Sequence, residues 1–467
     1  MQNLTDIRNN MRDLHLSEEI PLVSQLATQT RLTVDDREAI VTNAAHLVEQ
    51  IRGDKNPGMM EVFLAEYGLS NSEGIALMCL AEALLRVPDA QTMDDLIEDK
   101  LTDRGWAEHM GKSDSNLVNA STWALMLTGK VLDEAEEPGI FSAMRGLVKR
   151  VGEPVIRRAV RAAMKEMGNQ FVLGQTIQEA VKRGKSRKTQ GYTYSYDMLG
   201  EAALTDGDAR VFTKAYADAI THLAKHSTDK DVRNNPGISI KLSALFPRYE
   251  LAHREAVMDV LVKRLRDLVL LACDANMGLN IDAEEADRLD LSLDIIEAVL
   301  ADPRLTGWDG FGVVVQAYGK RAAPVLDWLY ATSERLDRKI MVRLVKGAYW
   351  DTEIKRAQVD ALNGFPVFTK KCATDISYVA CARKLLDMSD RIYPQFATHN
   401  AHSVHAVLKM AKGQKFEFQR LHGMGGALYD HVMAGADVRC RIYAPVGIHD
   451  DLLAYLVRRL LENGANS

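Results

Sequence analysis

A change in the spacing of apolar residues near residue 190 constrains the fold more than any other feature of the sequence. Beyond it, short apolar runs alternate with longer stretches of helical spacing. Strand alternating with helix predicts parallel strands joined by right-handed crossovers. The runs with strand character are 192–199, 237–242, 279–283, 312–317, 340–345, 395–398, 416–421 and 441–444.

Eight such units in about 275 residues fit a closed (βα)8 barrel of the TIM type. An open doubly wound sheet is the alternative, and it should carry a Gly-rich fingerprint after its first strand. The segment DMLGEA at 197–202 lacks that fingerprint. We therefore expect an α/β protein with a (βα)8 TIM-like barrel, preceded by an all-α N-terminal domain.

The first 190 residues have helical patterns almost throughout. Apolar spacing over 34–52, followed by Gly53, predicts one helix. Three further helices are expected at 72–85, 115–132 and 155–183. We interpret the basic stretch 182–188 as a linker in a surface loop. The domains expected are an N-terminal arm at 1–30, a helical domain with its linker at 31–185, and the barrel at 186–467 with a final helix at 449–463.

Composition narrows the class of protein and its compartment. With 47% hydrophobic residues, 26% charged residues and a net charge of −6, the chain is neither disordered nor rich in excess cations. We expect no nucleic-acid partner, because such a partner needs a surplus of Lys and Arg. The five cysteines form no C-x-x-C pair, and neither a signal peptide nor a long apolar run is visible. These features predict a cytoplasmic protein and leave peripheral contact with the inner face of the membrane open.

Polar side chains stand at the end of every predicted strand, where a barrel of this type places its active site. They are Asp197, Glu201, Lys241, Asp282, Gln316, Tyr318, Arg343, Lys346, His399, Asn400, Gln419, Arg420, His422 and Tyr443. Any one of them could be a structural group, but their presence at all eight ends indicates a functional site.

The last predicted helix carries Tyr455, Arg458, Arg459 and Glu462 on one face, at i, i+3, i+4 and i+7. Two adjacent guanidinium groups can grip a small carboxylate. An ordinary solvated face with an Arg458–Glu462 pair explains the same spacing, so the pattern alone leaves both readings open.

A metal site is not expected. His399, His402 and His405 are spread over about 240° of a helix at about 100° per residue, so they cannot converge on one ion.

Five motifs resemble the FAD-dependent proline dehydrogenases, and most closely the dehydrogenase half of the bacterial bifunctional proline utilization A (PutA) flavoproteins. They are YDMLGEAA at 196–203, SIKLSAL at 239–245, IDAEEADRL at 281–289, RLVKGAYW at 343–350 and YLVRRLLEN at 455–463. The helical segment ALMCLAEALL at 76–85 also looks like PutA.

The resemblance implies oxidation of L-proline to Δ1-pyrroline-5-carboxylate by hydride transfer to flavin N5, with electrons passed to a membrane quinone, as the first step of proline catabolism to glutamate. It implies that Arg458, Arg459 and Lys241 bind the proline carboxylate and that Asp282 orients these cations. Tyr349, Leu421, Tyr443 and Tyr455 would shape the pocket, and the bulk of Tyr443 would favour proline over 4-hydroxyproline. Glu201 and Arg458 would form a gate.

By the same resemblance, one group of residues holds FAD. Its members are Val314, Gln316, Arg343, Val345, Lys346, Gly347, Ala348, Trp350, Thr369, Lys370, Lys371, Thr398, His399, Asn400, Gln419, Leu421 and Glu462.

The chain also departs from the family pattern. PutA proteins continue into a C-terminal aldehyde dehydrogenase domain, whereas this sequence ends at Ser467. We therefore expect that activity to be absent and the chain to be a truncation. No ribbon-helix-helix segment is visible before Thr30, so no repressor activity is predicted.

Two rival classes remain. One is a metal-dependent barrel hydrolase that uses Asp282, Glu284 and His399; the other is a non-catalytic scaffold fragment.

Overall fold

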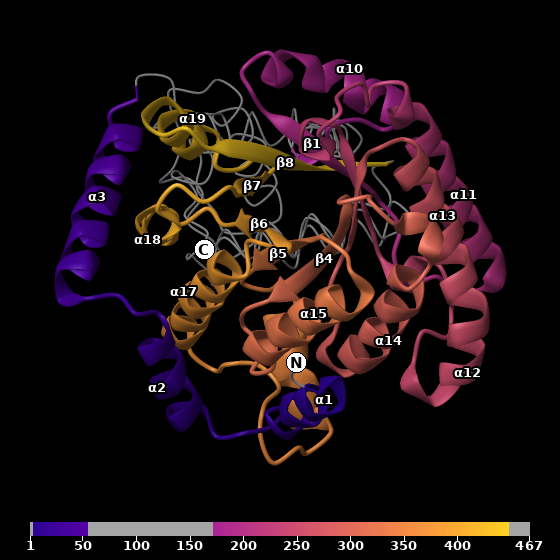
Figure 1. The fold of residues 1–467 in the computed structure, drawn as a ribbon, viewed down its shortest axis with the longest axis horizontal. Helices are drawn as coiled ribbons and strands as arrows, with labels where there is room; N and C mark the ends of the chain where they lie inside the picture. Colours follow the sequence, from indigo (N-terminus) through magenta and orange to yellow (C-terminus); the bar gives the residue numbers. More distant parts are fainter. Residues whose placement is uncertain (1–2, 55–170, 448–467) are drawn as a thin grey trace, which may run out of the picture. The chain divides into compact units, whose positions relative to one another are not determined.

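Eight parallel strands close into a barrel in the computed structural model, which describes residues 3–54 and 171–447. The strands pair in chain order, and β1 pairs with β8 to complete the ring (Figure 1). They are β1 (Thr193–Met198), β2 (Gly237–Ile240), β3 (Gly278–Ile281), β4 (Phe311–Gln316), β5 (Ile340–Val345), β6 (Ile392–Ala397), β7 (Glu417–Leu421) and β8 (Arg439–Val446). The predicted barrel is confirmed, and closure rules out the open sheet.

Helices surround the strands, as the alternating pattern predicts (Figure 1). Those of the barrel region are α10 (Ile177–Lys188), α11 (Asp206–Ala224), α12 (Arg254–Ala256), α13 (Val262–Asp274), α14 (Leu289–Leu300), α15 (Ala322–Leu336), α16 (Trp350–Val359), α17 (Lys371–Asp387), α18 (Ala401–Ala411) and α19 (Gly426–Gly435). A π-helical turn, Val257–Leu261, joins α12 to α13.

The barrel interior is polar, which is unusual because branched apolar side chains commonly fill it. At its amino end, Arg441 Nε lies 2.7 Å from Glu417 Oε1. Gln395 donates to the same carboxylate at 2.8 Å and accepts from Asn280 at 2.9 Å. All four side chains are buried. This network satisfies the polar groups that a sealed barrel cannot expose to water.

The N-terminal arm consists of α1 (Leu4–Asp13), α2 (Glu19–Gln29) and α3 (Val34–Arg52). These helices pack outside α15, α17 and α18, respectively (Figure 1). The predicted helix 34–52 is confirmed, with a Thr33–Asp36 capping box at its start and Gly53 at its end. In α1, the buried Arg8 pairs with Asp290 at 3.0 Å and lies over the ring of Trp328.

The interpretation of 182–188 as a loop is wrong, because these residues form the second half of α10. Thr176 caps the start of this helix, and Lys185, Arg187 and Lys188 occupy its last turn. Cations are stabilised there by the helix dipole, so the basic run favours the helix end. The helices expected at 72–85 and 115–132, most of 155–183 and all of 449–463 lie outside the described residues.

Two features of the composition, the cysteines and the lack of a long apolar run, can be compared with the described residues. Cys273, Cys372, Cys381 and Cys440 are free thiols; Cys381 and Cys440 are buried, whereas Cys372 is exposed. Within residues 3–54 and 171–447, no helix is long and apolar enough to cross a membrane.

The amino-end network yields a stability prediction. Glu417→Gln removes the countercharge of Arg441 while nearly preserving shape, and leaving one buried ion unpaired is strongly destabilising. We expect the free energy of unfolding, measured by urea titration, to fall by about 3–5 kcal/mol. Asp218→Asn, which breaks the exposed Lys214–Asp218 pair of α11, should cost less than about 1 kcal/mol. Equal losses in the two variants would contradict this account.

Candidate active site

Five side chains meet inside the carboxyl end of the barrel. Lys241 Nζ lies 2.6 Å from Asp197 Oδ1 and 3.6 Å from Asp282 Oδ2. Arg343 donates to Asp282 Oδ1 at 2.9 Å, and the Tyr443 hydroxyl donates to Asp282 Oδ2 at 2.7 Å. The Arg343 guanidinium also lies over the Tyr443 ring, 5.1 Å from its centroid. Asp282 therefore joins two cations and a phenol in one network, which we call the mouth cluster.

Strand register explains why these residues meet. Lys241 and Asp282 each follow directly on a strand, and Asp197 is the penultimate residue of β1. Because parallel strands end at the same mouth of a barrel, residues distant in sequence become neighbours there. Arg343 lies deeper, in β5, where its guanidinium donates to Ser239 Oγ at 2.9 Å and Ser195 Oγ at 3.3 Å. These serines fix the guanidinium from below.

The mouth cluster is almost closed to water, so its charges depend on one another. Asp197 is 0% exposed, and Lys241 is 7% exposed. Burial raises the pKa of Asp197, although the Lys241 ammonium opposes that rise. Burial disfavours the Lys241 charge, but Asp197, Tyr443 and Asp282 outweigh it and raise the Lys241 pKa well above its usual value. Lys241 is therefore a cation at neutral pH.

Formal charges in the mouth cluster balance. Lys241 and Arg343 are the cations, and Asp197 and Asp282 the carboxylates. A carboxylate ligand therefore meets donors already engaged by acids, so strong binding of such a ligand requires further cations.

A second group of predicted residues follows β5. Lys346 Nζ lies 2.7 Å from Asp375 Oδ1, and Lys371 Nζ lies 3.0 Å from Asp375 Oδ2. Burial opposes the Asp375 charge, but the two ammonium groups lower its pKa overall. Gly347 between strand and helix has φ +138°, and a Cβ there would come 2.5 Å from the Tyr318 ring. This tight turn therefore requires glycine.

The same region includes the start of α17. Trp350 Nε1 donates to the Phe368 carbonyl at 2.8 Å. Thr369, Lys370 and Lys371 are exposed, and Lys371 begins the helix. Cations at a helix N-terminus, where backbone N–H groups also gather, suit a phosphate group.

A third group lies just after β6 and within β7. His399 Nε2 accepts a hydrogen bond from the Leu421 N–H at 3.0 Å, so its proton lies on Nδ1 in the neutral ring. Asn400 uses its side-chain oxygen to cap α18 through Ser403. The Thr398 hydroxyl accepts from the Asn400 N–H. Gln419 donates to Glu417 at 2.9 Å, which links the mouth to the amino-end network.

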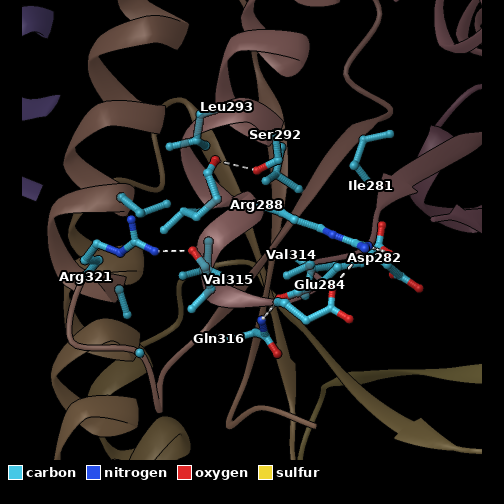
Figure 2. A pocket seen from close by; sticks show the side chains of 18 of the residues that line it. Ile281, Asp282, Glu284, Arg288, Ser292, Leu293, Val314, Val315, Gln316 and Arg321 are labelled. Atoms are coloured by element: carbon cyan, nitrogen blue, oxygen red, sulfur yellow. Dashed lines mark hydrogen bonds and ion pairs between the residues drawn. The ribbon is translucent and has the colours of Figure 1, made fainter. Parts of the chain in front are cut away.

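A pocket between the ends of β3 and β4 and helix α14 contains several of the predicted residues (Figure 2). Asp282, Val314 and Gln316 line it. The Gln316 amide donates to the Glu284 carbonyl at 2.8 Å, and Arg288 pairs with the Glu284 carboxylate at 3.1 Å. These contacts link β4 and the segment before α14 at the rim of the pocket.

The residues present fit a polar heterocycle with a phosphate tail such as FAD. Gln419 Oε1 and Arg343 Nε are buried at this end of the barrel, and neither has a hydrogen-bond partner in the described part of the chain. One atom accepts and the other donates, as the edge of a polar ring requires. Lys346, Lys370 and Lys371 supply positive charge for phosphates.

The hydrolase alternative is not favoured. Asp282 is engaged by Arg343 and Tyr443, while Glu284 accepts from the Ser243 N–H at 3.0 Å. His399 lies after β6 and accepts from Leu421. Among the residues that the structure describes, no three His, Cys, Asp or Glu side chains gather as metal ligands.

The structure thus brings Lys241, Asp282, Arg343 and Tyr443 together, as their positions at or near strand ends predict. The roles that the resemblance gives them stay predictions. The sequence places Asp197 at a strand end but indicates no role for it, although its carboxylate is the nearest acid to Lys241. The available signal was its position one residue before the end of β1, the strand that pairs with β2 just ahead of Lys241. Tyr455, Arg458, Arg459 and Glu462 lie outside the described residues, so their assigned roles stay predictions.

Comparisons with known proteins point to the same family as the resemblance of the five motifs. The family model "Proline dehydrogenase" matches residues 180–467. A second model, "DNA-binding domain of Proline dehydrogenase", matches 59–171. Almost all of that segment lies outside the described residues, so our expectation of no nucleic-acid partner stays a prediction.

Curated relatives and solved structures extend the likeness over most of the chain. "Bifunctional protein PutA" of Escherichia coli is 50% identical over 463 residues, covering 96% of this chain but 35% of the relative. "Proline dehydrogenase 1" of Bacillus subtilis (strain 168) is 26% identical over 302 residues, covering 64% of this chain and 87% of the relative. A crystal structure of a mutant PutA from Bradyrhizobium japonicum has a TM-score of 0.73 and 52% identity, covering 97% of this chain and 46% of that one. The chain thus spans about a third of the E. coli relative's length.

A double-mutant cycle tests the coupling inside the mouth cluster. Asp197→Asn and Lys241→Met each leave a buried charge without its nearest partner, so each should lower the free energy of unfolding by about 3–5 kcal/mol. The double variant removes both charges and should lose less than the sum of the two, with a coupling energy of about 0.5–3 kcal/mol. Urea titration of all four proteins measures it. Strict additivity would mean that the two groups do not interact.

Proposed function

The chain belongs to the proline dehydrogenase family, and on that premise we propose that it oxidises L-proline to Δ1-pyrroline-5-carboxylate with bound FAD. The observation that carries the proposal is the mouth cluster, in which Lys241, Arg343 and Tyr443 converge on Asp282. Such a site can orient a small zwitterion without a nucleophile or a metal.

We propose that FAD lies across the barrel mouth. The three predicted groups around this mouth would hold it: Val314, Gln316 and Arg343; Val345, Lys346, Gly347, Ala348, Trp350, Lys370 and Lys371; and Thr398, His399, Asn400, Gln419 and Leu421. The lysines would neutralise the pyrophosphate, while Arg343 and Gln419 would bond the ring. Thr369 and Glu462 are assigned to the same task from the sequence.

When bound, FAD would accept a hydride from the proline ring carbon beside the nitrogen, and the nitrogen would give up a proton. The protein supplies position and electrostatics. Arg343 is held by Asp282 and two serine hydroxyls, so its charge is preorganised beside the reacting ring. Tyr443 is fixed by its bond to Asp282, and its bulk would exclude a hydroxyl on the proline ring.

Proline binding requires more cations than the mouth cluster offers. Lys241 would bind the substrate carboxylate, but its charge is already balanced by Asp197. Arg458 and Arg459 are proposed to provide the surplus, with Glu201 as the gate partner of Arg458. Tyr349, Leu421 and Tyr455 are proposed to line the remaining pocket walls.

The electron acceptor, the location in the cell and the partner domain are inferred from the family, and we include them in the proposal. Electrons would pass from FAD to a membrane quinone, through peripheral contact of a cytoplasmic protein. In the full-length relatives a C-terminal aldehyde dehydrogenase domain would take the product. The domain division expected from the sequence, at 1–30, 31–185 and 186–467, stays a prediction; in the structure the N-terminal arm extends to Arg52 of α3.

Anaerobic titration with L-proline tests the function. The purified chain should be yellow, and its flavin absorbance should bleach stoichiometrically as L-proline is added. The metal-hydrolase and scaffold alternatives both predict no proline-dependent bleaching. A colourless preparation that also fails to bind added FAD would contradict the proposal.

Two substitutions test the assigned carboxylate contacts. Removing either guanidinium with Arg458→Met or Arg459→Met should raise the KM for proline at least tenfold, which corresponds to about 1.4 kcal/mol of binding. Steady-state assays with a dye acceptor measure this change. If both variants kept the wild-type KM, the arginines would not bind the carboxylate.

A further inference from the structure

A carboxylate of the N-terminal arm reaches one of the loops assigned to FAD. Glu19, the first residue of α2, accepts the Thr369 backbone N–H at 3.0 Å through Oε2 and at 3.3 Å through Oε1. The Thr369 hydroxyl donates to the same Oε2 at 2.9 Å. These are charge-assisted bonds between residues 350 positions apart. The arm therefore fixes both donors of Thr369 at once.

The loop 366–371 is otherwise anchored from inside. The Phe368 N–H donates to the Tyr318 carbonyl at 2.8 Å, and the Phe368 carbonyl accepts from Trp350 at 2.8 Å. The Phe368 side chain is 0% exposed and belongs to an apolar cluster with Leu22 and Leu26 of α2. The arm thus contacts the loop twice: α2 packs against the Phe368 side chain, and the Glu19 carboxylate accepts from Thr369.

A further contact ties the arm to the start of this loop. Lys320 donates through Nζ to the Ser17 carbonyl at 2.6 Å and through its backbone N–H to the Pro366 carbonyl at 3.1 Å. The side chain of Lys320 is buried. Lys320 therefore ties the segment before Glu19 to the start of the loop, which keeps the Glu19 carboxylate near Thr369.

The Glu19 contact changes the role open to Thr369. Its N–H and hydroxyl are both engaged by a carboxylate, so they are not free to bind a phosphate while that contact lasts. Lys370 and Lys371 come next in the chain, and Lys371 is bridged to Lys346 by Asp375. Fixing Thr369 therefore fixes the backbone from which the phosphate-binding cations extend.

We propose that Glu19 is a positioning residue for the cofactor site, acting through Thr369 to hold Lys370 and Lys371 in place for the FAD phosphates. The inference rests on the proposed function, since it takes FAD to be the ligand. It assigns to the N-terminal arm a part in retaining the cofactor.

The test is the dissociation constant of FAD for the full chain, measured by flavin fluorescence after cofactor removal. Glu19→Gln weakens both charge-assisted bonds, so FAD affinity should fall about tenfold, or about 1.4 kcal/mol. Glu19→Ala should lose at least as much. The KM for proline, measured at saturating FAD, should stay at the wild-type value in both variants.

Two control variants separate this role from general effects of the arm. Glu18→Gln removes an exposed charge at the same helix end without touching Thr369. Asp387→Asn breaks the ion pair between Arg31 of the arm and the other end of α17. Both controls should bind FAD as the wild type does, with thermal unfolding of the cofactor-free proteins reporting stability.

The possible results are distinct. Weakened FAD binding confined to the Glu19 variants supports the proposal. Unchanged binding overturns it, and so does tighter binding, which would mean that Glu19 competes with the phosphates for Thr369. Equal losses in the control variants would also overturn it, since any loosening of the arm would then suffice. If wild-type protein binds no FAD at all, the proposed function itself fails, and this inference with it.

Discussion

Burial of ionic groups inside the barrel is the constraint on which the rest of the structure depends. A charge removed from water is costly unless another charge or several hydrogen bonds satisfy it. The mouth cluster meets this condition through Asp282, which accepts from Arg343 and Tyr443 and lies 3.6 Å from Lys241. At the opposite end, Glu417 and Arg441 meet it in the same way. Both ends of the barrel interior are therefore held by buried ion pairs rather than by apolar packing.

This arrangement separates two tasks. The formal charges of the mouth cluster balance, and each of its side chains is held by hydrogen bonds or ion pairs, so it can orient a small polar ring without attracting anions in general. The excess positive charge lies outside it, on Lys346 and Lys371 beside Asp375, where a phosphate tail would reach. The N-terminal arm braces that outer region through Glu19. A flavin spanning both regions would use the neutral centre for chemistry and the cationic periphery for affinity.

The sequence predicted the barrel well because eight apolar runs, each followed by polar residues, leave few other topologies. It also predicted that Lys241, Asp282, Arg343 and Tyr443 converge, since parallel strands share one end. It missed what depends on contacts across the fold. Asp197 is one more strand-end acid until its 2.6 Å contact with Lys241 is known. In the sequence, the basic end of α10 resembles a loop, because charge alone does not distinguish a linker from a helix terminus. No local sequence feature relates Glu19 to Thr369, because the two residues lie 350 positions apart.

The central claim is that this barrel mouth holds FAD beside a five-membered imino acid. A crystal structure of the chain with FAD and an unreactive cyclic analogue of proline would test it most directly. The account predicts the flavin ring against Arg343, and the analogue's carboxylate within hydrogen-bond reach of Lys241, Arg458 and Arg459. A flavin bound away from the barrel mouth, or an analogue whose carboxylate contacts none of those three cations, would contradict it.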